Sequence, residues 1–101
     1  MKYRLKFMPA TIRDRNTIKA YLSQFYPGTS KRFFAHFKKK TAQIQEHPLS
    51  CPIYENNPIY RKMVVDDYLV FYVVNDAKRV VEIRRILHGA VEIPVEIETT
   101  K

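Results

Sequence analysis

The chain has 101 residues, 46% of them hydrophobic and 28% charged, and its formal net charge is +8. This size and hydrophobic share predict one folded domain over residues 1–101 and exclude a disordered chain. The excess of Lys and Arg indicates an acidic partner, either nucleic acid or an acidic protein. Cys51 is the only cysteine, which excludes an internal disulfide and predicts a cytoplasmic location. No stretch is apolar over enough residues to cross a membrane, and the segment Met1–Met8 is not expected to be a signal peptide.

The first two elements are expected to be a strand and a helix. Apolar Tyr3, Leu5 and Phe7 alternate with cationic residues, which is the period of a half-buried strand, and Pro9 ends it. A helix is then expected over Ile12–Phe25. Its buried stripe is predicted to be Ile18, Tyr21, Leu22 and Phe25, at positions i, i+3, i+4 and i+7. The pair Thr11 and Asp14 predicts a capping box at the start of this helix.

A second helix is expected after the break at Pro27-Gly28. Thr29 or Ser30 is expected to cap its start, and Pro48 closes it. Its buried stripe is predicted to be Phe33, Phe34, Phe37, Thr41 and Ile44. The short break makes the two helices an antiparallel hairpin, and neither helix buries its apolar stripe alone.

Three strands are predicted over Tyr60–Val65, Tyr68–Asn75 and Arg79–His88, joined by short polar breaks that favour antiparallel pairing. The middle strand is apolar on both faces and is therefore expected at the centre of the sheet. One face is predicted to carry Leu69, Phe71 and Val73, and the other Tyr68, Val70, Tyr72 and Val74. The predicted fold class is α+β: an N-terminal strand, a two-helix antiparallel hairpin, and a three-stranded antiparallel meander with both helices packed on one face.

Two segments outside these elements are expected to pack on the surface. Leu49–Pro58 holds two prolines and two adjacent asparagines and is predicted to be a loop. The tail over Val91–Glu98 alternates apolar and acidic residues. It is predicted to be either an edge strand or a turn that packs Ile93, Val95 and Ile97.

Basic residues gather at the ends of two predicted strands. Arg61 and Lys62 follow Tyr60, and strand alternation puts Arg84 and His88 on one face and Arg85 on the other. Together these residues would form a basic, aromatic-edged patch that holds phosphates and stacks a base. The alternative is that Arg84 pairs with Glu82 and that the tyrosine is packed rather than stacked on a ligand.

The second helix carries a further basic run, Lys38 to Lys40, on its predicted outer face. Lys38 and Lys39 are candidate contacts to phosphate or to a protein, although such a run is often only a solvated helix face. No phosphate-binding loop, metal-ligand pair or nucleophile elbow stands out from residue spacing. No metal and no cofactor are therefore expected.

Three strings, in their order and spacing, resemble the RelE/ParE superfamily of toxins from bacterial type II toxin–antitoxin modules, often called plasmid stabilisation proteins. They are P-I-Y-R at Pro58–Arg61, Y-L-V-F-Y-V-V at Tyr68–Val74, and R-I-L-H-G-A at Arg85–Ala90, followed by Ile93-Pro94. The resemblance covers nearly the whole chain. It implies an antitoxin as partner and no metal.

The resemblance implies one of two activities. RelE-like members cut messenger RNA on the ribosome with lysine and arginine side chains, whereas ParE-like members poison DNA gyrase. Leu69 stands where the nucleases usually carry arginine, and Val91 and Glu92 stand where H-G-A-R-D-like strings carry arginine and aspartate. These departures favour the ParE-like branch. If the chain is a nuclease instead, Arg61, Arg84 and His88 are the candidate catalytic residues, with Lys62, Arg85 and Tyr60 as binding residues.

Two further alternatives stay open: an inactive toxin homologue that regulates transcription with an antitoxin, and an unrelated basic RNA-binding domain. The predicted partners are thus an antitoxin and either gyrase or the ribosome and its message, with no membrane. The sequence leaves open whether the chain forms a homodimer.

Overall fold

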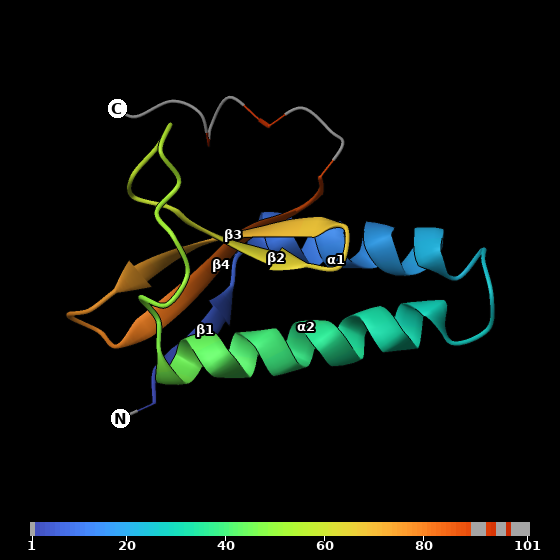
Figure 1. Cartoon of the computed structure of the whole chain (residues 1–101), viewed down its shortest axis with the longest axis horizontal. Helices are drawn as coiled ribbons and strands as arrows, with labels where there is room; N and C mark the ends of the chain where they lie inside the picture. Colours follow the sequence, from blue (N-terminus) through green and yellow to red (C-terminus); the bar gives the residue numbers. More distant parts are fainter. Residues whose placement is uncertain (1, 90–92, 95–96, 98–101) are drawn as a thin grey trace.

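The computed structural model describes residues 2–89, 93–94 and 97. The elements follow in the order β1 (Arg4–Phe7), α1 (Pro9–Leu22), α2 (Thr29–Glu46), β2 (Arg61–Val65), β3 (Tyr68–Asn75) and β4 (Val80–His88). The strands form one sheet in the order β1-β4-β3-β2, with both helices on one face (Figure 1). The predicted α+β class and the antiparallel pairing of the last three strands are confirmed. β1 joins the sheet beside β4 in the parallel direction.

The central strand β3 separates two apolar clusters, because its side chains alternate between the two faces of the sheet. On the helix-covered face, Tyr68, Val70 and Tyr72 pack with Phe33, Phe37 and Ile44 of α2 and Ile18 of α1. On the other face Phe71 is fully buried beside Tyr60, Leu87 and Ile97. The predicted assignment of β3 side chains to the two faces is confirmed. The sheet is therefore covered on both sides, by the helices and by the irregular segments.

An irregularity interrupts the pairing of β3 with β4. Phe71 pairs with Arg85 and Tyr72 pairs with Ile83, so Arg84 is an extra residue on β4. Ile83 and Ile86 consequently both belong to the helix-side cluster, although they are three residues apart. The unbroken alternation predicted for this strand is wrong at Arg84.

The predicted stripe of the first helix is only half correct. Ile18 is buried and Leu22 is packed against the core, but Tyr21 and Phe25 are 50% and 52% exposed. The reason is that α1 begins and ends three residues earlier than expected, at Pro9 and Leu22. Phe25 therefore lies in the connection to α2, and Tyr21 lies on the flank of the helix.

The predicted capping box is also wrong. The cap position of α1 is Met8, without a side-chain cap, and Pro9 stands in the first turn, where its missing N–H is tolerated. The Thr11 hydroxyl donates instead to the carbonyl of Ile83 at 2.6 Å. Asp14 accepts a hydrogen bond from the backbone N–H of Ile86 at 2.9 Å. The two polar side chains thus join α1 to the edge of β4.

Gly28 lies at the cap position of α2, where φ is 88°, so the expectation that Thr29 or Ser30 caps this helix is wrong. Glycine adopts this left-handed conformation without the steric cost of a side chain. The sharp reversal brings α2 back beside α1 as the predicted antiparallel hairpin, which we call the helical hairpin (Figure 1).

The C-terminal tail is described only in part. Ile93 and Ile97 pack on Phe71 and its neighbours, and the N–H of Ile97 donates to the carbonyl of Pro94 at 3.0 Å. These contacts agree with the turn alternative at the two described isoleucines. Val95, and the stretch 90–92 of the H-G-A-V-E string, lie outside the described residues. In the described ranges, none of the helices has the length and apolar character needed to cross a membrane.

Replacing Phe37 by Ala is expected to lower the free energy of unfolding by about 3–5 kcal/mol, because Phe37 is 5% exposed and packs on Phe7 and Phe33. The matched variant Phe25→Ala should lose less than about 1.5 kcal/mol, because that ring is half exposed. Denaturant unfolding measures both values. Equal losses in the two variants would contradict the assignment of the core.

Candidate functional site

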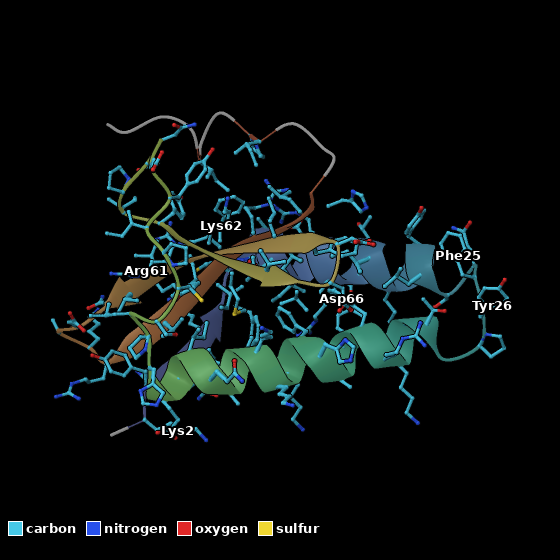
Figure 2. The ribbon with its side chains drawn as sticks, viewed as in Figure 1. Lys2, Phe25, Tyr26, Arg61, Lys62 and Asp66 are labelled. Atoms are coloured by element: carbon cyan, nitrogen blue, oxygen red, sulfur yellow. The ribbon has the colours of Figure 1, made fainter. Side chains whose placement is uncertain are left out.

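Arg61 opens β2, and its guanidinium is held by the loop that precedes the strand (Figure 2). One of its terminal nitrogens donates to the backbone carbonyl of Cys51 at 2.7 Å and to that of Leu49 at 3.3 Å. A loop of this kind leaves carbonyl groups without strand partners, and Arg61 satisfies two of them. In this structure Arg61 therefore fixes the loop against β2.

The neighbouring residues Tyr60 and Lys62 also contact the loop side of the sheet. The Tyr60 ring is 6% exposed and packs edge-on against Phe71, with ring centroids 6.4 Å apart. The Lys62 ammonium lies 5.9 Å from the centre of the Tyr54 ring, in the range of a cation–π contact. Tyr60 is thus a core side chain, whereas the Lys62 side chain is partly exposed.

Two arginines on β4 are held by carboxylates. Arg84 contacts Glu82, two residues earlier on the strand, at 2.7 Å, and 34% of its side chain is exposed. Arg85 forms a bidentate ion pair with Asp14 of α1, in which two guanidinium nitrogens lie 2.8 and 3.0 Å from the two carboxylate oxygens. Only 21% of the Arg85 side chain is exposed. Bidentate pairs of this type hold the guanidinium in one orientation. The sequence alternative of an Arg84–Glu82 pair is confirmed.

His88 ends β4 beside Tyr68, and their rings meet edge-to-face with centroids 5.2 Å apart. Gly89 follows and donates its N–H to the carbonyl of Asp67 at 2.8 Å, which ties the end of β4 to the β2–β3 turn. His88 also borders a pocket of about 400 Å³ between α1 and the end of β4. The pocket is lined mainly by apolar groups, and its residues are Asp14, Thr17, Ile18, Tyr21, Tyr68, Ile86, Leu87 and His88.

The strand register decides which candidate residues lie near one another. Lys62 and Arg85 both pair with Phe71, from opposite sides, so they share one face across two strand spacings, or roughly 10 Å. Arg61 pairs with Tyr72 on the other face of the sheet. The five basic candidate side chains thus contact different partners and do not converge on one site. A role of Arg61, Arg84 or His88 in chemistry stays a prediction.

Lys38 and Lys39 are exposed on α2, as expected for the outer face of the helical hairpin. Their role in binding also stays a prediction. Among the described residues there is no group of three or more His, Cys, Asp or Glu side chains arranged to hold a metal ion.

Two features of this region were missed by sequence reasoning. Asp14 was assigned to a helix cap, and no signal in the sequence pointed from it to Arg85, 71 residues away. Tyr72 was assigned to packing alone, but its buried hydroxyl donates to the carbonyl of Pro48 at 2.8 Å. Burial, together with the adjacent Cys51 side chain, raises the pKa of Tyr72 above its usual value.

The raised pKa of Tyr72 has a consequence for stability at high pH. Since an unfolded tyrosine loses its proton near pH 10, the unfolded state releases protons before the folded state does, and stability should fall as the pH rises above about 10. Burial likewise raises the pKa of Tyr68. Tyr72→Phe should cost about 1 kcal/mol at neutral pH, through the lost hydrogen bond, and make the alkaline loss shallower. Denaturant unfolding between neutral pH and pH 11 checks this, and an unchanged slope in Tyr72→Phe would refute the assignment.

The sequence was compared with protein families and with known proteins. A family model described as the ParE toxin of the type II toxin–antitoxin system parDE matches residues 5–92, which is most of the chain. A search of curated proteins finds no match.

Several solved structures share the fold. A chromosomal ParDE system from P. aeruginosa is 14% identical, covers 86% of this chain and 96% of its own, and superposes with a TM-score of 0.69. The isolated E. coli RelE toxin is 18% identical, with coverages of 89% and 87% and a TM-score of 0.63. The RelBE2 toxin–antitoxin complex from Mycobacterium tuberculosis is 18% identical, with coverages of 87% and 99% and a TM-score of 0.61. At these identities the likeness shows the fold alone.

Proposed function

We propose a function from the premise that this chain belongs to the ParE family of toxins from type II toxin–antitoxin systems. The chain is thus a toxin of such a module. Our proposal is that it inhibits DNA gyrase, in the manner implied by the ParE-like branch, and that a cognate antitoxin neutralises it.

The observation that carries the gyrase proposal is that the arginines of β2 and β4 are held by contacts within the protein. Arg61 is bound to loop carbonyls, Arg84 to Glu82 and Arg85 to Asp14. A metal-independent nuclease needs positive groups directed at the phosphate where charge develops during cleavage. Each of these guanidiniums would have to exchange a protein contact for the phosphate. This arrangement favours a structural role for the arginines.

The environment of β3 supports the same proposal. Leu69 is paired with Leu87, and Phe71 is buried among Tyr60, Leu87 and Ile97. An RNA-cleaving site on this face would have to displace apolar side chains, and burying phosphates beside them would be costly. A run of exposed lysines lies on α2, where Lys38 and Lys39 are available to a protein partner.

An antitoxin is proposed as the second partner. Several of the similar solved structures are toxin–antitoxin complexes, including those from Mycobacterium tuberculosis and E. coli. The net charge of +8 favours an acidic or amphipathic antitoxin segment, whose binding should weaken as salt is added. A segment that folds as it binds would cover apolar surface such as the pocket beside His88.

A ribosome-dependent nuclease is the second candidate, and one observation favours it. Arg84 is about one-third exposed and pairs with Glu82 of its own strand, so it is more accessible to a substrate than Arg85, which is 21% exposed. The E. coli RelE toxin also superposes nearly as well as the P. aeruginosa ParDE structure. A toxin homologue that acts only in transcriptional regulation would arrest growth in neither way.

The purified protein is expected to produce gyrase-dependent cleavage of plasmid DNA and to leave a message on translating ribosomes intact. Arg84→Ala should retain the effect on gyrase, because the proposal gives Arg84 no part in it. Reversal of charge in the double variant Lys38→Glu/Lys39→Glu should weaken the effect about tenfold or more, as loss of steering charges does.

The matched control for that double variant is Lys78→Glu, which changes an exposed lysine in the β3–β4 turn, outside the helical hairpin. It should behave as the wild type. Ribosome-dependent cleavage of the message by the wild type, abolished in Arg84→Ala, would replace the gyrase proposal by the nuclease.

A further inference from the structure

The last turn of α1 and the connection to α2 project aromatic side chains into solvent. Tyr21 and Phe25 are half exposed, and Tyr26 is 84% exposed. Tyr21 and Phe25 contact each other edge-to-face, with centroids 5.1 Å apart, so they form a cluster. Figure 2 shows Phe25 and Tyr26 at the end of the helical hairpin, where it extends beyond the sheet. We call Tyr21, Phe25, Tyr26 and the adjacent Lys31 the hairpin tip.

The hairpin tip is not required by the packing of the domain. The helix-side cluster is completed by Ile18, Phe33 and Phe37, with Leu22 packed at its border. Tyrosine and phenylalanine side chains that stay exposed together are typical of protein–protein contact sites, where aromatic residues carry much of the binding energy. The cluster therefore has the character of a binding surface rather than of an unfinished core.

The charge of the helical hairpin indicates the chemistry of the partner. The sequence holds no acidic residue between Asp14 and Glu46, and residues 1–46 carry eleven Lys and Arg residues against two acidic ones. Lys31 stands in the first turn of α2, where a helix favours acidic side chains, and this turn has no side-chain cap. Arg32 borders a pocket with Asp66 and Asp67, whereas Lys31 is exposed, so Lys31 is the cation of this turn that is available to a partner. An acidic partner surface would complement this arrangement.

We propose that the hairpin tip docks into an apolar depression rimmed by acidic side chains on a folded protein, and that this protein is the target of the toxin. The inference rests on the proposed function, since it names the part of the helical hairpin that engages the target. The aromatic rings enter the depression, and Lys31 pairs with its acidic rim. Such a contact gives affinity through buried aromatic surface and orientation through charge.

Shape favours a folded protein over the other occupants. The hairpin tip is a projection, so its partner must be concave, whereas a short antitoxin segment that folds as it binds needs a groove to lie in. Duplex DNA offers grooves lined by polar groups and phosphates, which suit Lys31 but not a cluster of apolar rings. The target is accordingly expected to bind Phe25 and Tyr26 of the tip, while an antitoxin covers the pocket beside His88, which Tyr21 borders.

The test uses the full chain and the double variant Phe25→Ala/Tyr26→Ala. Its affinity for purified gyrase should fall at least tenfold, with a matching loss of gyrase-dependent DNA cleavage, while binding of the antitoxin changes less than twofold. The matched control is Leu49→Ala/Ile59→Ala, which removes two exposed aliphatic side chains from the loop before β2. That control should equal the wild type in all three measurements.

A second variant keeps the test valid if the aromatic double variant unfolds. Lys31→Glu should weaken gyrase binding most at low salt, whereas Lys78→Glu should not. Wild-type gyrase affinity in the folded tip variants, or an equal loss of antitoxin binding, would overturn the inference. Binding of a DNA duplex alone that is lost in Phe25→Ala/Tyr26→Ala would overturn it as well.

The failure of this inference and the failure of the proposed function are distinguishable. If the wild type does not act on gyrase, the proposed function fails. Growth arrest by the tip variants, compared with the wild type, then tests whether the tip binds another target. Tip variants that still bind the antitoxin but no longer arrest growth would support the docking role. Tip variants that arrest growth as the wild type does would refute it.

Discussion

The carboxylate of Asp14 is the contact on which the arrangement of helices and sheet depends. β1 pairs with β4 only as far as Ile83, so the rest of β4 has no strand on that side. α1 covers this edge: the Thr11 hydroxyl binds the Ile83 carbonyl, and Asp14 accepts from the Ile86 N–H while it pairs with Arg85. A partly buried carboxylate is stable only with such partners. One side chain therefore caps a sheet edge, orients α1 and neutralises an arginine.

This use of Arg85 bears directly on function. The arginines of β2 and β4 are held in carboxylate and carbonyl contacts and offer little free positive charge for RNA chemistry. Its unbalanced charge lies in residues 1–46, which comprise β1 and the helical hairpin. The fold thus separates β2, β3 and β4, with their apolar clusters, from a basic segment suited to a partner. Docking to a protein target follows from that separation more readily than catalysis does.

The sequence predicted the elements whose signal is local. The apolar run between two polar breaks defined β3 to the residue, and the apolar stripe of α2 predicted the burial of Phe33, Phe37 and Ile44. Sequence reasoning failed where the structure depends on contacts between residues far apart in the chain. Asp14 resembled a helix cap because its partner is 71 residues away, and the extra residue at Arg84 appears only when β4 is paired with β3. Phe25 has the spacing of a buried helix residue, but α1 ends at Leu22, so Phe25 lies outside the helix.

The central claim is that Arg85 serves the fold through Asp14. The decisive measurement is the free energy of unfolding of Asp14→Ala, Arg85→Ala and the double variant, with growth arrest recorded for each. The account predicts that each single variant loses about 3 kcal/mol, that the double variant loses little more, and that growth arrest declines only as the folded fraction does. An Arg85→Ala protein with wild-type stability and no growth arrest would contradict the account, because it would give that guanidinium a direct part in toxicity.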